Sequence, residues 1–301
     1  MKRVQQLPRN FCLLALAITV FLGTRAARAE SDLEKVLKQY DSQTVKGYIQ
    51  PMVDFFGANM NAGLYHSAAI PKVGLKIELD LVGMGSLVGD EQKTYSAPAP
   101  PGFGASTFKT ATIFGGKGGR ITTPDSLSYS GSDGIIDATL FPLAVPQLTI
   151  GSVAGTEATI RFITSPSIKA FPTTTLFGAG LRHSVSQYLP AAPLDIAVGG
   201  FYSSFTVGDI IDFKGLSIGA QGSISFTVAT LYSGLAWEKS TMNLKYGAST
   251  PGAPAVNIDL DGSNNFRFTA GGALSLGVLK IFADANFGSV TNFSGGIGLG
   301  F

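Results

Sequence analysis

Residues 292–301 read Asn-Phe-Ser-Gly-Gly-Ile-Gly-Leu-Gly-Phe, and this stretch decides the fold. Its apolar side chains, Phe293, Ile297, Leu299 and Phe301, alternate with small or polar residues. Period-two alternation indicates a β-strand whose two faces meet different surroundings. In a transmembrane barrel, such a strand turns its apolar side chains to lipid and its small or polar ones to the lumen. A soluble edge strand gives the same pattern, so the rest of the chain decides between the two.

The N-terminal end, residues 1–29, has the form of a secretory signal peptide. A basic region precedes an apolar run and a small-x-small cleavage motif: Lys2, Arg3 and Arg9, then residues 11–23, then Ala27-Arg28-Ala29. The apolar run is shorter than the roughly 20 residues that span a bilayer, although a retained anchor is the alternative. We therefore expect export, with a mature chain that starts at Glu30.

Composition narrows the class of the exported chain. Removal of residues 1–29 takes away five of the 22 basic residues and no acid, so 17 remain against 20 acids and the formal charge moves from +2 to −3. This balance does not favour binding to nucleic acid. The one cysteine, Cys12, lies in the leader, which excludes disulfides and thiolate metal sites from the mature chain. Only 14% of the residues are charged, against about 25% in a typical soluble domain.

Alternating segments recur along residues 62–301 and predict an all-β fold, a transmembrane antiparallel barrel of about 12 strands, between 10 and 14. A secreted β-sandwich or β-helix is the competing fold. The stretch 86–146 is rich in proline and glycine and is expected to be loop with one embedded strand. If the chain ends in the periplasm, the turns near Gly277 and at 238–240 are periplasmic and residues 249–263 are extracellular. Strands are expected to start near residues 62, 72, 107, 147, 156, 176, 194, 214, 230, 240, 264, 278 and 292.

Charged residues on the alternating strands are predicted to line the lumen. Lysine or arginine on the lipid face costs about 2–4 kcal/mol at the bilayer midplane, so these side chains should point inward. The predicted lumen residues are Lys76, Glu78, Asp80, Arg161 and Arg182.

Residues 30–61 have helical rather than period-two spacing. A capping box at residues 31–34 starts one helical stripe, and a second stripe is expected to be interrupted at Pro51. Helices ahead of a barrel either lie in the periplasm or insert into the lumen. The end of this segment is apolar enough for a plug or gate formed by Phe55, Phe56, Asn59 and Asn61.

We expect no enzymatic activity and no metal or cofactor site, because each candidate motif departs from the pattern that its chemistry requires. Each of the two histidines, His66 and His183, is followed by a serine, as in outer-membrane lipid-modifying enzymes. Neighbours in a strand point to opposite faces, so His183 and Ser184 cannot pair. Residues 259–262 resemble a calcium loop, but the glycine comes too early and Ala270 replaces the bidentate acid, which favours a hairpin loop.

Several motifs resemble a family of bacterial outer-membrane barrels catalogued as a domain of unknown function. They are the stretches at residues 59–65, 111–115, 146–151, 156–161, 178–190 and 193–199. The chain departs from the family in its Ala/Pro-rich loop at 97–101. More remotely, a plug ahead of a barrel is similar to the FadL-like transport porins. That resemblance implies uptake of hydrophobic molecules through a gap in the wall and assigns no ligand residue.

The resemblance implies placement in the bacterial outer membrane, with lipid and the barrel-assembly machinery as partners. In such families the machinery recognises the terminal strand, which here carries Phe293, Ile297, Leu299 and Phe301. The predicted function is passive transport of small hydrophobic compounds. A structural or adhesive barrel with a closed lumen is the alternative, and a lipid-modifying enzyme is the third possibility. A wet, continuous lumen would favour transport, and a lumen filled by its own side chains would favour the structural role.

Overall fold

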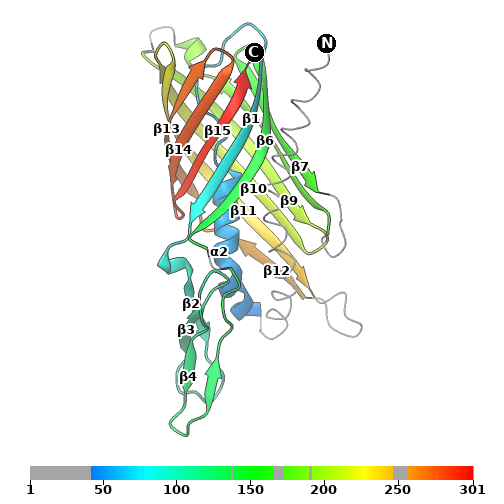
Figure 1. Cartoon of the computed structure of the whole chain (residues 1–301), viewed down its shortest axis with the longest axis vertical. Helices are drawn as coiled ribbons and strands as arrows, with labels where there is room; N and C mark the ends of the chain where they lie inside the picture. Colours follow the sequence, from blue (N-terminus) through cyan, green and yellow to red (C-terminus); the bar gives the residue numbers. More distant parts are fainter. Residues whose placement is uncertain (1–41, 137, 166–171, 190–191, 247–255, 301) are drawn as a thin grey trace.

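Ten antiparallel strands close into a barrel in the computed structural model of the chain (Figure 1). The structure describes residues 42–136, 138–165, 172–189, 192–246 and 256–300. The strands of the wall are β1 (Lys76–Leu87), β6 (Leu140–Val153), β7 (Thr156–Ser165), β8 (Thr174–Ser184), β9 (Asp195–Val207), β10 (Ile211–Ser225), β11 (Ala229–Tyr246), β13 (Phe266–Leu276), β14 (Leu279–Phe287) and β15 (Asn292–Gly300). They pair in this order, and β15 pairs back with β1, which confirms the predicted fold class.

One long strand replaces two that the sequence predicted. β11 runs unbroken through residues 229–246, so the strands expected near 230 and 240 are one, and the turn expected at 238–240 is wrong. Its first half pairs with β13 and its second half with the additional strand β12 (Val256–Asp261). Asp259 therefore lies in a strand and not in a hairpin loop. No turn residue marks the point at which β11 changes partner, between Trp237 and Thr241.

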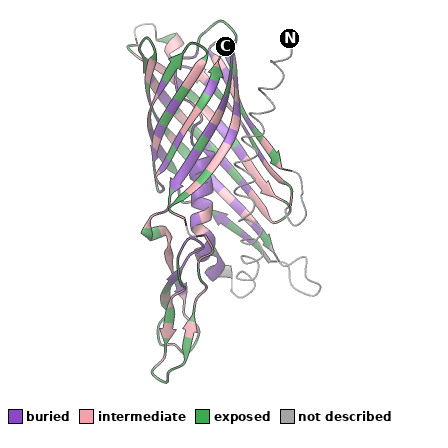
Figure 2. Ribbon diagram, in the orientation of Figure 1, coloured by how far each residue is buried: buried purple, intermediate pink, exposed green. Residues whose placement is uncertain are grey.

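The wall alternates as the terminal strand predicted. On β15, Phe293, Ile297 and Leu299 are exposed on the outer surface, whereas Asn292 and Ser294 are buried inside (Figure 2). Phe301 lies outside the described residues. Closure of the sheet pairs the backbone groups between strands, which is the requirement for a β-structure in lipid. Aromatic side chains are exposed on the outside of most strands, among them Phe162, Phe177, Tyr202, Trp237, Phe266, Phe287 and Phe293.

An extension of residues 88–139 leaves the barrel between β1 and β6 (Figure 1). It contains η1 (Asp90–Gln92), β2 (Thr94–Pro98), β3 (Thr107–Ala111), β4 (Arg120–Thr122) and β5 (Ser128–Ser130). β2 pairs with β3 and β4 pairs with β5, so the strand expected near 107 exists but lies outside the wall. No strand starts near 62, because the described residues 61–75 form turns and irregular structure.

The helix α2 (Ser42–Met60) lies between the extension and the barrel (Figure 1). It continues through Pro51, so the interruption expected there is wrong. Its apolar face is buried against the extension and against β11 and β12. None of the described helices is long and apolar enough to cross a membrane. Residues 1–41, which include the predicted signal peptide and capping box, lie outside the described residues. The remaining short helix, η2 (Ser186–Tyr188), lies in the connection between β8 and β9.

A candidate functional site in the barrel lumen

The segment of residues 61–70 runs through the inside of the barrel, and Arg161 of β7 holds its start. An irregular segment leaves carbonyl groups without backbone partners, and these must be satisfied when buried. The Arg161 guanidinium donates to the carbonyls of Met60 at 3.1 Å, Ala62 at 2.7 Å and Gly63 at 2.8 Å. Its Nε donates to Gln147 at 2.8 Å, and its guanidinium carbon lies 5.4 Å from the Phe201 ring centroid.

A second arginine, Arg182 of β8, holds the middle of the same segment. It donates to the Ser67 carbonyl at 2.9 Å and to Gln221 at 2.7 Å, and its guanidinium carbon lies 5.3 Å from the Tyr65 ring centroid. Its charge is compensated by an ion pair with buried Glu157. The Ala68 N–H donates to Ser223 Oγ at 2.9 Å.

The third anchor is an ion-pair cluster around Glu78, which is fully buried. His66 Nε2 lies 2.5 Å from one carboxylate oxygen, and the Nζ atoms of Lys280 and Lys76 lie 2.7 and 3.4 Å from the other. His66, Glu78 and Asp80 place possible metal-ligand atoms within 4.8 Å of one another. Two ammonium groups already neutralise the Glu78 carboxylate, so the cluster reads as a charge network that fastens His66 to the wall.

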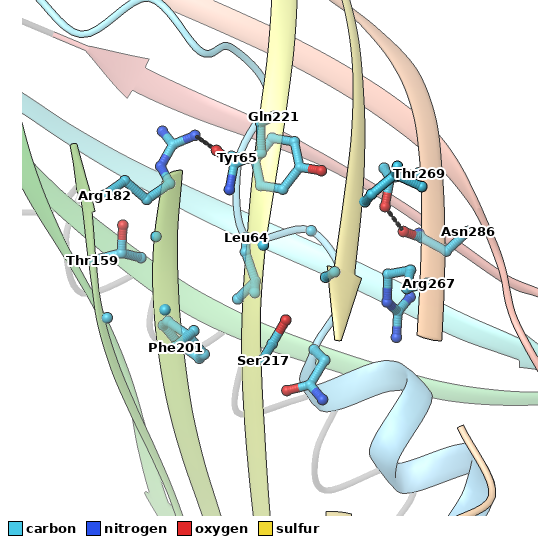
Figure 3. A pocket seen from close by; sticks show the side chains of 18 of the residues that line it. Leu64, Tyr65, Thr159, Arg182, Phe201, Ser217, Gln221, Arg267, Thr269 and Asn286 are labelled. Carbon is cyan, nitrogen blue, oxygen red and sulfur yellow. Dashed lines mark hydrogen bonds between the residues drawn. The ribbon is translucent and has the colours of Figure 1, made fainter. Parts of the chain in front are cut away.

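A small cavity remains between the lumen segment and the wall (Figure 3). Its volume is about 40 Å³, and Tyr65, Arg182, Ser217 and Gln221 are among the residues that line it. A cavity of at least about 10–15 Å³ can hold a water molecule, so this one is large enough for water and too small for a larger solute. Buried Asn61 also faces it, and neither side-chain polar atom of Asn61 has a hydrogen-bond partner within the described part of the chain.

The opposite half of the barrel interior is apolar and is filled by α2. The Phe56 ring centroid lies 5.1 Å from Phe141 of β6, 4.9 Å from Phe205 of β9 and 5.9 Å from Phe213 of β10. Phe55 packs 4.9 Å from Phe114 of the extension. Met242, Leu244, Ile258 and Leu260 of β11 and β12 complete this core. We call this set the aromatic cluster: Phe55, Phe56, Phe114, Phe141, Phe205 and Phe213.

The wall beside the aromatic cluster has an unpaired seam between β6 and β7. Pairing of the two strands runs from Val153 to Gln147 on β6, with a register shift between Val153 and Gly151, and ends at the Gln147–Arg161 pair. Beyond that point, residues 140–146 pair only with β1, and residues 162–165 pair only with β8. The two prolines of β6, Pro142 and Pro146, fall in this part, and proline lacks the N–H that a ladder needs. Figure 1 shows the two strands diverging there.

The structure brings the five predicted lumen residues together inside the barrel. Glu78, Asp80, Arg161 and Arg182 are buried, and Lys76 is partly buried. The predicted plug residues are divided. Phe55 and Phe56 join the aromatic cluster, whereas Asn59 bonds Ser86 at 2.8 Å and the Phe141 carbonyl at 2.8 Å at the rim. Only Asn61 reaches the lumen cavity.

Sequence reasoning missed the residues 62–70 that cross the lumen and the pair of Arg267 with Glu238. Arg267 Nε donates to Glu238 at 2.7 Å, and its terminal nitrogen donates to the Ala58 carbonyl at 2.7 Å. The alternation of β13 placed Arg267 on the polar face, which was a usable signal. Glu238 was not predicted to face the lumen, because a turn was expected at residues 238–240, where β11 in fact continues.

Three solved outer-membrane proteins are similar to this chain: the protease OmpT of Escherichia coli (8% identity, 77% of this chain and 98% of that one, TM-score 0.35), the translocator domain of the autotransporter NalP of Neisseria meningitidis (13%, 93% and 97%, 0.26) and a Pseudomonas aeruginosa FadL homologue (8%, 87% and 98%, 0.27). No curated protein matches the sequence. Residues 1–301 match a family of unknown function (DUF6588), and the chain belongs to that family.

Proposed function

We propose that the barrel passes small apolar compounds passively through the side of its wall. The observation that carries this proposal is the unpaired seam between β6 and β7 with the aromatic cluster behind it. The apolar side chains provide a surface that a hydrophobic solute can bind. Because β6 and β7 are not hydrogen-bonded to each other at the seam, the solute can leave between them without breaking backbone hydrogen bonds.

The lumen axis does not offer the same route. Residues 61–70 occupy it, and the arginine and glutamate anchors would leave buried charges unpaired if the segment withdrew. The seam begins at the level where the lumen segment enters the barrel. Arg161 is the last residue of β7 that pairs with β6, and its guanidinium also donates to the carbonyls of Met60 and Ala62. Phe162, the first residue of β7 beyond its last pair with β6, is exposed on the outer surface, where lipid would receive the solute.

The second candidate is a structural barrel with a closed lumen, which the 40 Å³ cavity favours. We propose no enzymatic role. His183 contacts Thr156 Oγ1 at 2.8 Å, Gln187 at 2.8 Å and Tyr188 at 3.0 Å, and His66 contacts Glu78. Among the described residues, neither histidine is hydrogen-bonded to both a serine and a carboxylate, the arrangement that activates a serine nucleophile.

Cross-linking the seam tests the transport proposal. Ala144→Cys with Thr164→Cys places one thiol on each free edge, opposite each other if the β6–β7 register is continued. Leu148→Cys with Ile160→Cys is the matched control, because these residues are already paired on the same two strands. We expect a short bis-maleimide to reduce uptake of a fluorescent apolar naphthylamine to the level of cells without the protein in the first variant only. Equal uptake with and without the cross-link would contradict the lateral route and leave the closed barrel.

A further inference from the structure

The connections at the two ends of the barrel differ in length. At the end that carries Gly300, β6–β7, β10–β11 and β13–β14 are joined by residues 154–155, 226–228 and 277–278, and only the β8–β9 connection, 185–194, is longer. The opposite end has short connections as well, residues 208–210 and 288–291, but it also carries the much longer extension of residues 88–139. Outer-membrane barrels keep short turns in the periplasm and long connections outside. The Gly300 end therefore faces the periplasm.

The lumen segment runs from the outer end to the periplasmic end. Asn59 bonds Ser86, near the outer end of β1, and also contacts Asn292 at the start of β15. Further along, Ala68 bonds Ser223, near the periplasmic end of β10, and Ala68 and Ile70 pack with Ala197 near the start of β9. Residue 76 then begins β1 at the periplasmic end, where Glu78 pairs with Gly300.

The helix α2 is therefore attached at the outer end. Tyr95 Oη donates to the Thr44 carbonyl at 3.0 Å, and the Ile113 N–H donates to the Tyr48 carbonyl at 2.9 Å, so the extension covers the helix. The outside of β11 also changes character at this level. Leu231, Leu235 and Trp237 are followed on the same outer face by Lys239 and Lys245, both exposed. The outer face of this part of β11 therefore suits water better than lipid, because a lysine on the lipid face is costly.

We infer that α2 and residues 88–139 form a cap on the cell surface, and that the chain enters its own barrel from outside, towards the periplasm. In this arrangement α2 lies at the outer mouth of the barrel and not in the periplasm: Phe56 packs inside the wall on Phe205 and Phe213, whereas Thr44 is bonded by the extension. This inference rests on the outer-membrane barrel and goes beyond the transport proposal, because it assigns the surface that external molecules meet. A compound arriving from outside would meet this cap before the seam.

Single cysteines test the sidedness, because residues 30–301 contain no cysteine. Lys46→Cys on α2 and Ala105→Cys in the extension are exposed on the proposed outer side, and Lys72→Cys is exposed on the periplasmic side of the same lumen segment. On intact cells carrying the full chain, we expect a membrane-impermeant maleimide to label the first two, and to label Lys72→Cys only after the outer membrane is permeabilised. Labelling of Lys72→Cys alone would reverse the orientation. Labelling of Lys46→Cys and Lys72→Cys from the same side would show that the segment does not thread the barrel. Either result overturns the inference, and neither depends on uptake.

Discussion

The two halves of the barrel interior are filled by the same stretch of chain in opposite ways. Near the periplasmic end, the wall presents Glu78, Arg161 and Arg182 to residues 61–70. Near the outer end, it presents Phe213 and Leu244 to α2. Both sets are inward-facing residues of alternating strands.

The difference follows from the backbone of the filling segment. A helix satisfies its own N–H and C=O groups, so its surroundings need only match its side chains, and apolar packing is sufficient. The irregular segment 61–70 cannot do so, and its buried carbonyls need donors from the wall. An arginine supplies several donors from one side chain, so Arg161 can bond the carbonyl of Met60 at the end of α2 together with the carbonyls of Ala62 and Gly63 in the segment.

The largest effect should come from Arg161→Met, which keeps the length of the side chain and removes its donors. Three buried carbonyls would lose their partner, at about 1–3 kcal/mol each. We expect the free energy of unfolding to fall by about 5 kcal/mol, measured by denaturant titration in detergent, together with faster tryptic cleavage at Lys72. Arg120→Met, on an exposed arginine of the extension, is the control and should change neither. Unaltered stability in Arg161→Met would mean that the lumen segment does not need its anchor.

A smaller and differently placed effect is expected from Phe55→Ala. The side chain is fully buried between α2 and the extension, and truncation of a core phenylalanine costs about 3–4 kcal/mol. Tryptic cleavage at Lys46 and within residues 93–120 should accelerate. The barrel itself should stay folded, which is measured as a band that migrates faster on SDS gels when the sample is not boiled. Leu127→Ala, at an exposed position of the extension, provides the comparison and should behave as wild type. Loss of the folded barrel band in Phe55→Ala would show that the two interiors are not separable.

The smallest effect concerns Asp54 of α2, whose carboxylate accepts hydrogen bonds from the Ser263 N–H at 2.7 Å and Gln50 at 3.0 Å. Burial raises the pKa of Asp54 above its ordinary value of 3.8. The folded state therefore holds this proton more tightly than the unfolded state. The stabilisation is complete below the unfolded pKa and is lost as the pH rises through the folded pKa.

Asp54→Asn should remove this part of the pH dependence, an effect of about 1 kcal/mol or less in the unfolding free energy. Denaturant titrations at a series of pH values above 3.8 measure it, with exposed Asp90→Asn as the control. A steeper loss of stability with pH in Asp54→Asn than in wild type would contradict the assigned direction of the shift.

Most of the wall could be predicted from the sequence, because lipid and lumen impose opposite preferences on alternate residues. Arg161 and Glu78 were placed inside on this ground, and the terminal strand marked its outer face. At residues 242–246 the two faces of the wall are reversed. There Met242 and Leu244 point inward onto α2, because the wall has left the lipid and the apolar surroundings are now inside. Alternation shows which residues share a face of a strand, but it does not show whether the apolar face points inward or outward.

By itself, the sequence determined that the chain forms strands, that a helical segment precedes them and that Glu78 and Arg161 face inward, because these properties depend on local spacing. Tertiary structure alone decided that ten strands close the wall, that β11 takes two partners and that residues 61–70 cross the lumen. Those outcomes depend on pairing between residues far apart in the chain. No local pattern records which carbonyl a distant arginine such as Arg161 will reach.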